Sequence, residues 1–454
     1  MPDKLPHSLL RSLEQVAGFD RSAFIHVHES GVQVTSVRMN PNKDAAHQLP
    51  VSGIVPWSSQ GYYLSERPSF ILDPLLHAGV YYVQEASGMF LEQALKQSVD
   101  LSQPIRVLDL CAAPGGKSTL LQSLISTESL LVSNDVIKSR AGILEENLTK
   151  WGAPNVIITN NDPEDFARLE NFFDVIVVDA PCSGSGLFRR DPEAIAEWSE
   201  QHVQLCCQRQ HRILVDVYPA LKQGGLLIYS TCSYSKEENE DVLDWICDAF
   251  EVMPLPLNID PSWNIVPVQS DKHKAPGYRF FPNKVQGEGF FIACMRKEDG
   301  TTASLRPPKK SLLQKLSKNE TTVVGPWLQP GLQLWKQADR ILAFPASLDA
   351  ALLAIIEKLY VRSAGISMGK IAGNDLVPDH ALAVSTILSN ETVSVSLNKP
   401  AALQYLRKEE VSVESDHKGW ALVKYGGAGL GWVKLLQNRV NNYYPSAWRI
   451  LKTG

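Results

Sequence analysis

Two of the seven cysteines stand where a thiol can do chemistry. Cys182 and Cys232 are flanked by proline, serine, threonine or glycine instead of aliphatic residues, so we expect accessible thiols. At a junction between a strand and a helix, local backbone dipoles can acidify a thiol and make it a competent nucleophile. Four other cysteines are expected to act as small buried apolar side chains: Cys206, Cys207, Cys247 and Cys294.

A glycine turn between an apolar strand and a helix is a second candidate for chemistry, within the string VLDLCAAPGGKST. Such a turn lets a ligand approach the backbone, and the helix N-terminus offers unpaired N–H groups. A P-loop would use Gly116-Lys117-Ser118, but it requires glycine where Cys111 stands and leaves both cysteine motifs unexplained. We therefore favour the first turn of a Rossmann-like methyltransferase, which holds S-adenosylmethionine.

The elements that must position these groups alternate between strands and helices from residue 105 to about 297. This alternation predicts an α/β domain with a mainly parallel sheet covered on both faces. The expected strands are Val107–Leu110, Leu130–Ser133, Val156–Thr159, Val175–Val178, Gly225–Tyr229 and Gly289–Met295. The expected helices are Ser118–Ser126, Ala141–Trp151, Pro192–Tyr218 and Lys236–Phe250.

Polar residues follow these strands, where ligands bind in sheets of this kind. Asp135 comes after the second strand, at a suitable distance for a carboxylate that binds ribose hydroxyls. Asn161 and Asp162 follow the third strand and are suited to contact adenine, and Asp179 follows the fourth. A single aspartate after a strand is more often a helix cap, but a series of polar strand ends favours a ligand site.

One reaction class needs both a methyl donor and a thiolate, namely methylation of a pyrimidine ring carbon. Carbon 5 of cytosine is a poor nucleophile until a thiolate adds to carbon 6. The addition product is an enamine, which can attack a sulfonium methyl group. A carboxyl group near the ring nitrogen would offset the charge that builds up there, and Asp179 is placed for this role. Loss of the carbon-5 proton and expulsion of the thiol complete the cycle.

The strings VLDLCAAPGGKST, VVDAPCSGSGLFRRDP and YSTCSYSKEENEDV resemble the signature motifs of the Nol/Nop/Sun (NSUN) family of RNA cytosine-C5 methyltransferases. The resemblance spans roughly residues 62–297 and implies a class I methyltransferase fold with a mainly parallel, seven-stranded sheet. It implies that Cys232 is the nucleophile and that Cys182 assists product release. DNA cytosine methyltransferases, which use a Pro-Cys nucleophile, would exchange these roles. The residues that it implies bind the donor are Cys111, Ala112, Ala113, Pro114, Gly115, Gly116 and Lys117, together with Asp135, Asp162 and Asp179. Asn283 stands where the family pattern has histidine, which puts a proton-transfer role there in doubt.

Residues 1–100 are expected to form an α+β region, which resembles the RNA-binding leader of the bacterial ribosomal RNA enzymes of the family. The pattern predicts a helical start at Leu5–Val16 and strands at Phe24–His28 and Val32–Val37. His26 and His28 would then share one face of a strand, as two metal ligands can. No third ligand is near them in the sequence, so we expect solvent-facing histidines and no metal site.

Beyond the methyltransferase region of residues 101–297, residues 298–322 have the composition of a flexible basic linker, with Pro307-Pro308-Lys309-Lys310 at its centre. An α/β extension is expected over 323–390, with a helix at Leu352–Leu359. A small β domain is expected over 391–454, with strands at Gly419–Tyr425 and Gly429–Lys434. This tail resembles the PUA-like RNA-binding unit of the bacterial 16S ribosomal RNA enzymes of the family. Its exposed aromatic, Arg and Asn residues could stack on unpaired bases, although Trp420 and Trp432 are better suited to a barrel core.

Composition and charge limit the classes of partner that the protein is expected to bind. Residues 298–454 carry 19 Lys and Arg against 13 Asp and Glu, whereas residues 1–297 carry 25 against 36, and a basic appendix suits a polyanion. No apolar run approaches a membrane span, no secretory leader is apparent, and the cysteines lack a C-x-x-C pair. We therefore expect a cytoplasmic, monomeric enzyme that binds neither membrane nor DNA. Its expected substrate is 16S ribosomal RNA or the small ribosomal subunit. The alternatives are transfer RNA as substrate, or a non-catalytic RNA-binding assembly factor.

Overall fold

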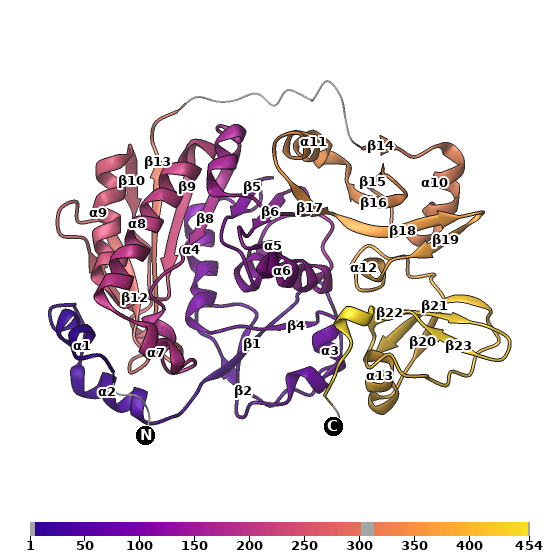
Figure 1. The fold of residues 1–454 in the computed structure, drawn as a ribbon, viewed down its shortest axis with the longest axis horizontal. Coiled ribbons are helices and arrows are strands. Elements are labelled where there is room, and N and C mark those ends of the chain that lie inside the picture. The colour runs from indigo at the N-terminus through magenta and orange to yellow at the C-terminus, as the bar shows by residue number, and fades with distance from the viewer. Residues whose placement is uncertain (1–4, 301–312, 453–454) are drawn as a thin grey trace.

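The computed structural model describes residues 5–300 and 313–452, and its largest sheet forms the centre of the molecule (Figure 1). The strands of this sheet are β5 Arg106–Asp109, β6 Leu130–Asn134, β7 Val156–Thr159, β8 Phe173–Asp179, β9 Leu221–Thr231, β10 Val252–Leu255, β11 Val266–Gln269, β12 Pro276–Phe280, β13 Phe290–Lys297 and β17 Val361–Ala364. They lie in the order β11-β12-β13-β9-β8-β5-β6-β7-β17, and β10 pairs with β13.

The centre of this sheet has the expected methyltransferase topology. Five neighbouring strands, β7-β6-β5-β8-β9, are parallel. Beyond β9, β13 runs antiparallel to them, and β10 pairs antiparallel with β13 and so runs in the same direction as the five. These seven strands are extended to ten by β11, β12 and β17. The chain order reverses between β5 and β8, so the C-terminal ends of these strands flank the crevice where such folds bind ligands.

Helices cover both faces of the sheet because its central strands are apolar on both sides. One face packs against α4 Leu91–Ser98, α5 Gly116–Leu124 and α6 Lys138–Trp151. The other packs against α8 Glu200–Val217, α9 Glu240–Ala249 and α11 Asp349–Lys358. The expected single helix Pro192–Tyr218 is wrong at one point, because it divides into α7 Glu193–Glu197 and α8. The side chain of Ser199 caps α8 by accepting a hydrogen bond from the His202 N–H, which favours a new helix start.

The N-terminal region contains α1 His7–Leu13, α2 Arg21–Glu29, β1 Thr35–Met39, β2 Val51–Ile54, β3 Gly61–Leu64, α3 Pro74–His77 and β4 Tyr81–Val83. The strand expected at Phe24–His28 is wrong, because these residues lie in α2. The Asp20 side chain caps that helix by accepting from the Ala23 N–H, and Phe24 is its fully buried residue. His26 and His28 therefore do not share a strand face. Within the described residues no cluster of three or more His, Cys, Asp or Glu side chains could hold a metal ion.

The chain after residue 312 forms two further small sheets. The first contains β14 Gln314–Lys315, β15 Leu332–Gln337, β16 Arg340–Pro345, β18 Ile366–Ala372 and β19 Asp375–Pro378. The second contains β20 Ser394–Ser396, β21 Gly419–Tyr425, β22 Ala428–Leu435 and β23 Val440–Asn442, with α12 His380–Ala383 and α13 Lys399–Leu406 beside them. The strands predicted around Trp420 and Trp432 and the helix predicted near Leu352 are confirmed.

The predicted flexible linker over 298–322 differs from the structure at its C-terminal end, which is helical. Its central prolines and lysines lie outside the described residues, but α10 Lys318–Val324 begins before residue 322. Ser317 and Glu320 form a reciprocal capping box at the start of this helix. The Ser-x-x-Glu spacing that forms the box is therefore the local signal for a helix here.

The C-terminal part is packed onto the rest of the molecule (Figure 1). Strand β17 pairs antiparallel with β7 and so completes one edge of the central sheet. A separate apolar core combines N-terminal residues, such as Val37 and Tyr81, with C-terminal ones, such as Ala421 and Tyr444. The chain ends therefore share a core, although they are far apart in sequence. Among the described helices, none has the length and hydropathy needed to cross a bilayer.

Candidate active site

The two sequence-predicted thiols meet at the C-terminal edge of the central sheet. Strands β8 and β9 are parallel neighbours, and Asp179 lies opposite Ser230 at their ends. The loops that follow bring the Sγ atoms of Cys182 and Cys232 to 3.0 Å, with both cysteines half-buried. The expectation that the two sulfur atoms converge is confirmed.

The sulfur contact affects the thiol of Cys182. The hydrogen bond with Cys232, together with burial, raises the pKa of the Cys182 thiol well above its ordinary value. Cys182 therefore keeps its proton at neutral pH, and it lies within hydrogen-bonding distance of the Cys232 sulfur.

An acid–base pair lies beside the thiols and joins them to the glycine turn. The Lys117 ammonium is 2.7 Å from Oδ2 of Asp179, and the Ser230 hydroxyl donates to Oδ1 at 2.8 Å. Burial opposes the charge on Lys117, but the adjacent Asp179 carboxylate outweighs it and raises the pKa of the lysine. The pair is therefore a cation and an anion at the point where the first and fourth parallel strands end.

The glycine turn has the conformation that its sequence requires. Gly115 precedes α5 with φ of 114°, a region that other residues rarely adopt. A Cβ atom on Gly116 would be 3.3 Å from the Tyr82 ring, so the turn also packs closely. Behind the turn, the Ser118 hydroxyl donates to Oδ2 of Asp109 at 2.6 Å. Burial raises the pKa of Asp109 to about 7, and its Oδ1 has no partner among the described residues.

Of the other predicted donor contacts, Asp135 lies directly beside the turn. Asp135 is buried, accepts from the Ala113 N–H at 3.3 Å and from the Ile137 N–H at 2.9 Å, and lies near Arg140. This carboxylate is therefore next to the donor loop, as expected.

Residues 161 and 162 take structural roles. Asp162 caps the 3-10 helix Pro163–Leu169 and lies 3.4 Å from Arg212, as in the helix-cap alternative. Asn161 forms hydrogen bonds with both the N–H and the C=O of Tyr360, each at 2.9 Å. Its side chain thus fastens the chain before β17 to the central sheet.

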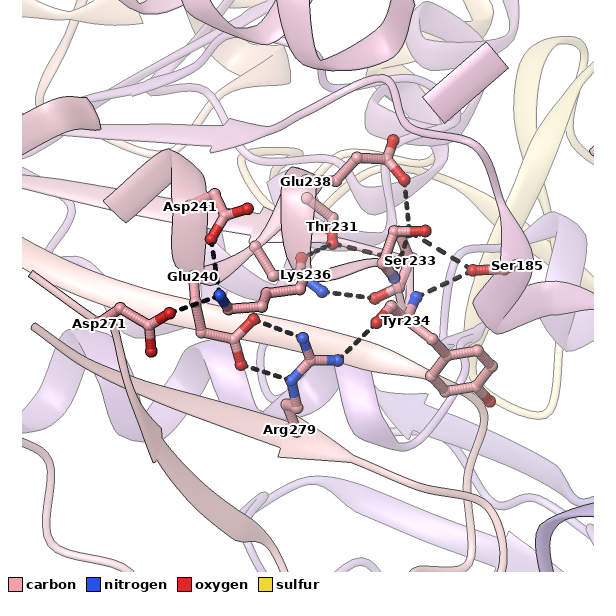
Figure 2. Close-up of polar contacts among 12 residues, drawn as sticks. Ser185, Thr231, Ser233, Tyr234, Lys236, Glu238, Glu240, Asp241, Asp271 and Arg279 are labelled. Atoms are coloured by element: carbon pink, nitrogen blue, oxygen red, sulfur yellow. Dashed lines mark hydrogen bonds and ion pairs between the residues drawn. The ribbon is translucent and has the colours of Figure 1, made fainter. Parts of the chain in front are cut away.

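Sequence reasoning missed one prominent residue of the site, Glu238. Its carboxylate is fully buried and binds Ser183 and Ser233, the residues that directly follow the two cysteines. Figure 2 shows Glu238 pointing at Ser233, which in turn faces Ser185. Glu238 belongs to the polar run Lys-Glu-Glu-Asn-Glu, which has the composition of a solvated helix start. Nothing in that run distinguishes it from its half-buried neighbour Glu237, and only the tertiary structure does so.

Asn283, where the family pattern has histidine, lies half-buried in the turn after β12. Its neighbours Phe280 and Phe281 are buried in separate aromatic clusters. This position therefore belongs to a well-packed turn, and the doubt about proton transfer there stands.

A parallel sheet with a glycine turn at its switch point, bearing two thiols in contact, defines a Rossmann-like methyltransferase of the two-cysteine class. Family models match in three places: "16S rRNA methyltransferase RsmB/F" over 97–296, "N-terminal domain of 16S rRNA methyltransferase RsmF" over 5–86, and "Methyltransferase RsmF PUA domain" over 392–450. The chain belongs to the ribosomal RNA small subunit methyltransferase F family.

Curated relatives support this assignment along most of the chain. The ribosomal RNA small subunit methyltransferase F of Enterobacter sp. (strain 638) is 30% identical over 413 residues, which cover 86% of this chain and 83% of the relative. The protein of the same name from Shewanella loihica is 29% identical, with 86% and 82% covered.

Solved structures show the same fold. A methyltransferase homologue from Pyrococcus horikoshii is 28% identical with a TM-score of 0.51, covering 64% of this chain and all of that one. NSun6 from Pyrococcus horikoshii, solved with SFG, has 18% identity, a TM-score of 0.54 and coverage of 66% and 100%, and shows the fold alone.

Proposed function

We propose that this protein is an S-adenosylmethionine-dependent RNA cytosine-C5 methyltransferase that forms 5-methylcytosine in 16S ribosomal RNA. The observation that carries the proposal is the contact of the Cys182 and Cys232 sulfur atoms beside the Lys117–Asp179 pair. A thiolate is needed to activate carbon 5 of cytosine, and few other reactions need two thiols next to a methyl-donor loop. Membership of the family supports ribosomal RNA as the substrate.

The residues around the glycine turn fit the methyl donor. Gly115 and Gly116 leave the backbone open where a side chain would be strained or crowded, and Asp135 lies beside the turn. The buried Oδ1 of Asp109 has no partner among the described residues, so it can accept a hydrogen bond from a bound group. S-adenosylmethionine, when bound, supplies an electrophilic methyl group. We propose that the segment from Cys111 to Lys117, together with Asp135, Asp162 and Asp179, holds it.

The cytosine must leave its stack to reach the thiols, as in other enzymes that modify bases. The Cys232 thiolate then forms a bond to carbon 6, and the ring electrons move so that carbon 5 becomes nucleophilic. Cys182 keeps its proton and contacts Cys232, and we propose that it donates a hydrogen bond to the Cys232 thiolate before attack.

Asp179 and Lys117 are placed to stabilise the activated ring. The carboxylate can accept a hydrogen bond from the exocyclic amine, and the ammonium beside it can offset negative charge at the ring nitrogen. Once carbon 5 carries the methyl group, its proton must leave so that the bond from carbon 6 to the Cys232 sulfur can break. The carbon-5 proton passes to water and the Cys232 sulfur leaves as a thiolate. Cys182 assists this last step, which releases methylated RNA.

RNA is the partner that this function requires, and its place of action is where ribosomes are assembled, the cytoplasm. The N-terminal and PUA-like regions that flank the methyltransferase domain match models of the same family and are candidates for holding the RNA. We propose that the enzyme acts as a monomer. Transfer RNA is the rival substrate, and a non-catalytic assembly factor is the rival function.

The test uses 16S RNA transcribed with cytosine tritiated at carbon 5, either naked or assembled into small subunits. The enzyme should release tritium into water only when S-adenosylmethionine is present, because the carbon-5 proton leaves after methyl transfer. Absence of release from both substrates would contradict the proposal. Release from transfer RNA alone would favour the rival substrate, and bisulfite sequencing of the product would locate the modified cytidine.

A further inference from the structure

A single buried carboxylate connects the two loops that carry the thiols. Oε1 of Glu238 accepts from the Ser183 N–H at 2.7 Å and from the Gln210 amide at 3.3 Å. Oε2 accepts from the Ser183 hydroxyl at 2.6 Å and from the Ser233 hydroxyl. Because Ser183 and Ser233 directly follow Cys182 and Cys232, each thiol is one residue away from an anchor on the same carboxylate.

We propose that Glu238 is a positioning residue that sets the distance between the Cys182 and Cys232 sulfur atoms. The inference rests on the proposed function and adds a residue that does not itself touch the reacting atoms. Strand register aligns β8 and β9 only as far as Asp179 and Ser230. β9 itself ends at Thr231, which pairs with Phe291, so the cysteines lie in loops and contacts between the loops must align them. The two serines on one carboxylate, with hydroxyl oxygens 3.2 Å apart, form such a contact directly beside the thiols.

A carboxylate suits this role better than a neutral side chain. Its two oxygen atoms accept all four hydrogen bonds without contributing a donor, so both serine hydroxyls and the Ser183 N–H are satisfied together. No Lys, Arg or His forms an ion pair with Glu238 among the described residues. Burial raises the pKa of Glu238, and the donated hydrogen bonds oppose that shift. The group is therefore costly to bury, and these hydrogen bonds offset that cost.

Other contacts hold the Cys232 loop in place without Glu238, so a variant should fold. The Gly186 N–H donates to the Cys232 C=O at 2.8 Å, and the Tyr234 N–H donates to the Ser185 hydroxyl at 2.9 Å. Arg279 donates to the Tyr234 C=O at 2.7 Å and is itself paired with Glu240 (Figure 2). Loss of Glu238 should therefore free the link between the two serines and leave the surrounding backbone largely anchored.

The experiment compares Glu238→Ala and Glu238→Gln with a matched control, Glu92→Gln. Glu92 is also buried and also accepts from a serine hydroxyl and a backbone N–H, those of Ser58 and Ser59, but it lies on α4. Two quantities are measured on the full-length protein at a temperature where each variant is folded. The first is kcat and KM for tritium release from 16S RNA. The second is the rate at which diamide, a thiol oxidant, forms the Cys182–Cys232 disulfide, followed by peptide mass spectrometry.

Glu238→Ala should lower kcat by about 100-fold, which is the loss expected when a reacting group is displaced by about 1 Å. The KM values for RNA and for the methyl donor should stay within about twofold of those of the wild type. The same variant should also slow formation of the Cys182–Cys232 disulfide. Glu238→Gln keeps the shape and part of the hydrogen bonding, so both quantities should lie between those of Glu238→Ala and the wild type. Glu92→Gln should leave both unchanged.

An unaltered disulfide rate in Glu238→Ala, or a kcat equal to that of the wild type, would overturn the inference. If Glu238→Ala does not fold, Glu238→Gln decides, and wild-type values for both quantities would overturn the inference. The disulfide measurement needs no substrate. If the wild-type protein released no tritium, the proposed function would be refuted, but the disulfide measurement would still test the role of Glu238.

Discussion

The catalytic edge and the PUA-like region differ in how exposed their candidate functional side chains are. At the edge of the central sheet the groups are buried or half-buried and are tied to one another, as in the chain of contacts from Lys117 through Asp179 to Ser230. In the PUA-like region Trp420 is 8% exposed and Trp432 is 1% exposed, so both serve the core. Tyr443, whose ring lies 4.5 Å from that of Trp420, is 43% exposed.

This difference follows from what each region must do. Bond formation depends on fixed distances between atoms, and a network of buried hydrogen bonds supplies them. Stacking on an unpaired base requires an accessible ring and tolerates variation in its position. A substitution at the catalytic edge should therefore change the rate, whereas one in the PUA-like region should change affinity. The predictions below test that division.

The largest effect is expected for Cys232→Ala, which removes the proposed nucleophile. Methyl transfer to 16S RNA should fall by about 10⁴-fold or more, because the variant lacks the sulfur that adds to carbon 6. The assay is transfer of a labelled methyl group. Cys247→Ala is the control, since that thiol lies on α9 and takes no part in the site. Retention of turnover by Cys232→Ala, or loss with Cys247→Ala, would show that the nucleophile is wrongly assigned.

Cys182→Ala should leave the first bond intact and block release. The expected result is a covalent RNA–protein adduct that survives denaturing electrophoresis and requires S-adenosylmethionine and Cys232. If the roles of the cysteines are exchanged, as in DNA cytosine methyltransferases, the adduct will instead form with Cys232→Ala. The double variant should form none, which checks that another thiol is not responsible.

A smaller effect is expected for Tyr443→Ala in the PUA-like region. Loss of one stacking ring typically costs about 1 kcal/mol or more, so the Kd for a 16S RNA fragment should rise by roughly fivefold or more. The affinity for S-adenosylmethionine should not change. Tyr360→Ala is a suitable control because its side chain is also exposed but lies beside the central sheet. Equal effects of the two substitutions on RNA binding would remove the proposed distinction between the regions.

The same contrast explains how far the sequence alone could predict the structure. The strands of the central sheet and the turn at Gly115 are encoded locally, by apolar runs and by a backbone conformation that favours glycine. The convergence of Cys182 and Cys232 followed from parallel strands ending at one edge. The role of Glu238 is set by contacts that are distant in sequence. So is the pairing of β17 with β7. The helix around Phe24 was wrongly predicted to be a strand, because a short stretch with apolar residues at alternate positions fits the period of a helix as well as that of a strand.

The smallest expected effect concerns how the C-terminal part is attached. Arg362 on β17 pairs with Glu145 on α6, and both side chains are partly exposed. Arg362→Ala should lower the free energy of unfolding by less than about 1 kcal/mol, as is typical of such ion pairs. Asn161→Ala removes two hydrogen bonds to the backbone of Tyr360 and leaves those groups short of partners, so it should cost about 1–3 kcal/mol. Urea denaturation measures both. A larger loss for Arg362→Ala than for Asn161→Ala would mean that charge, not hydrogen bonding to the backbone, fixes this region to the catalytic domain.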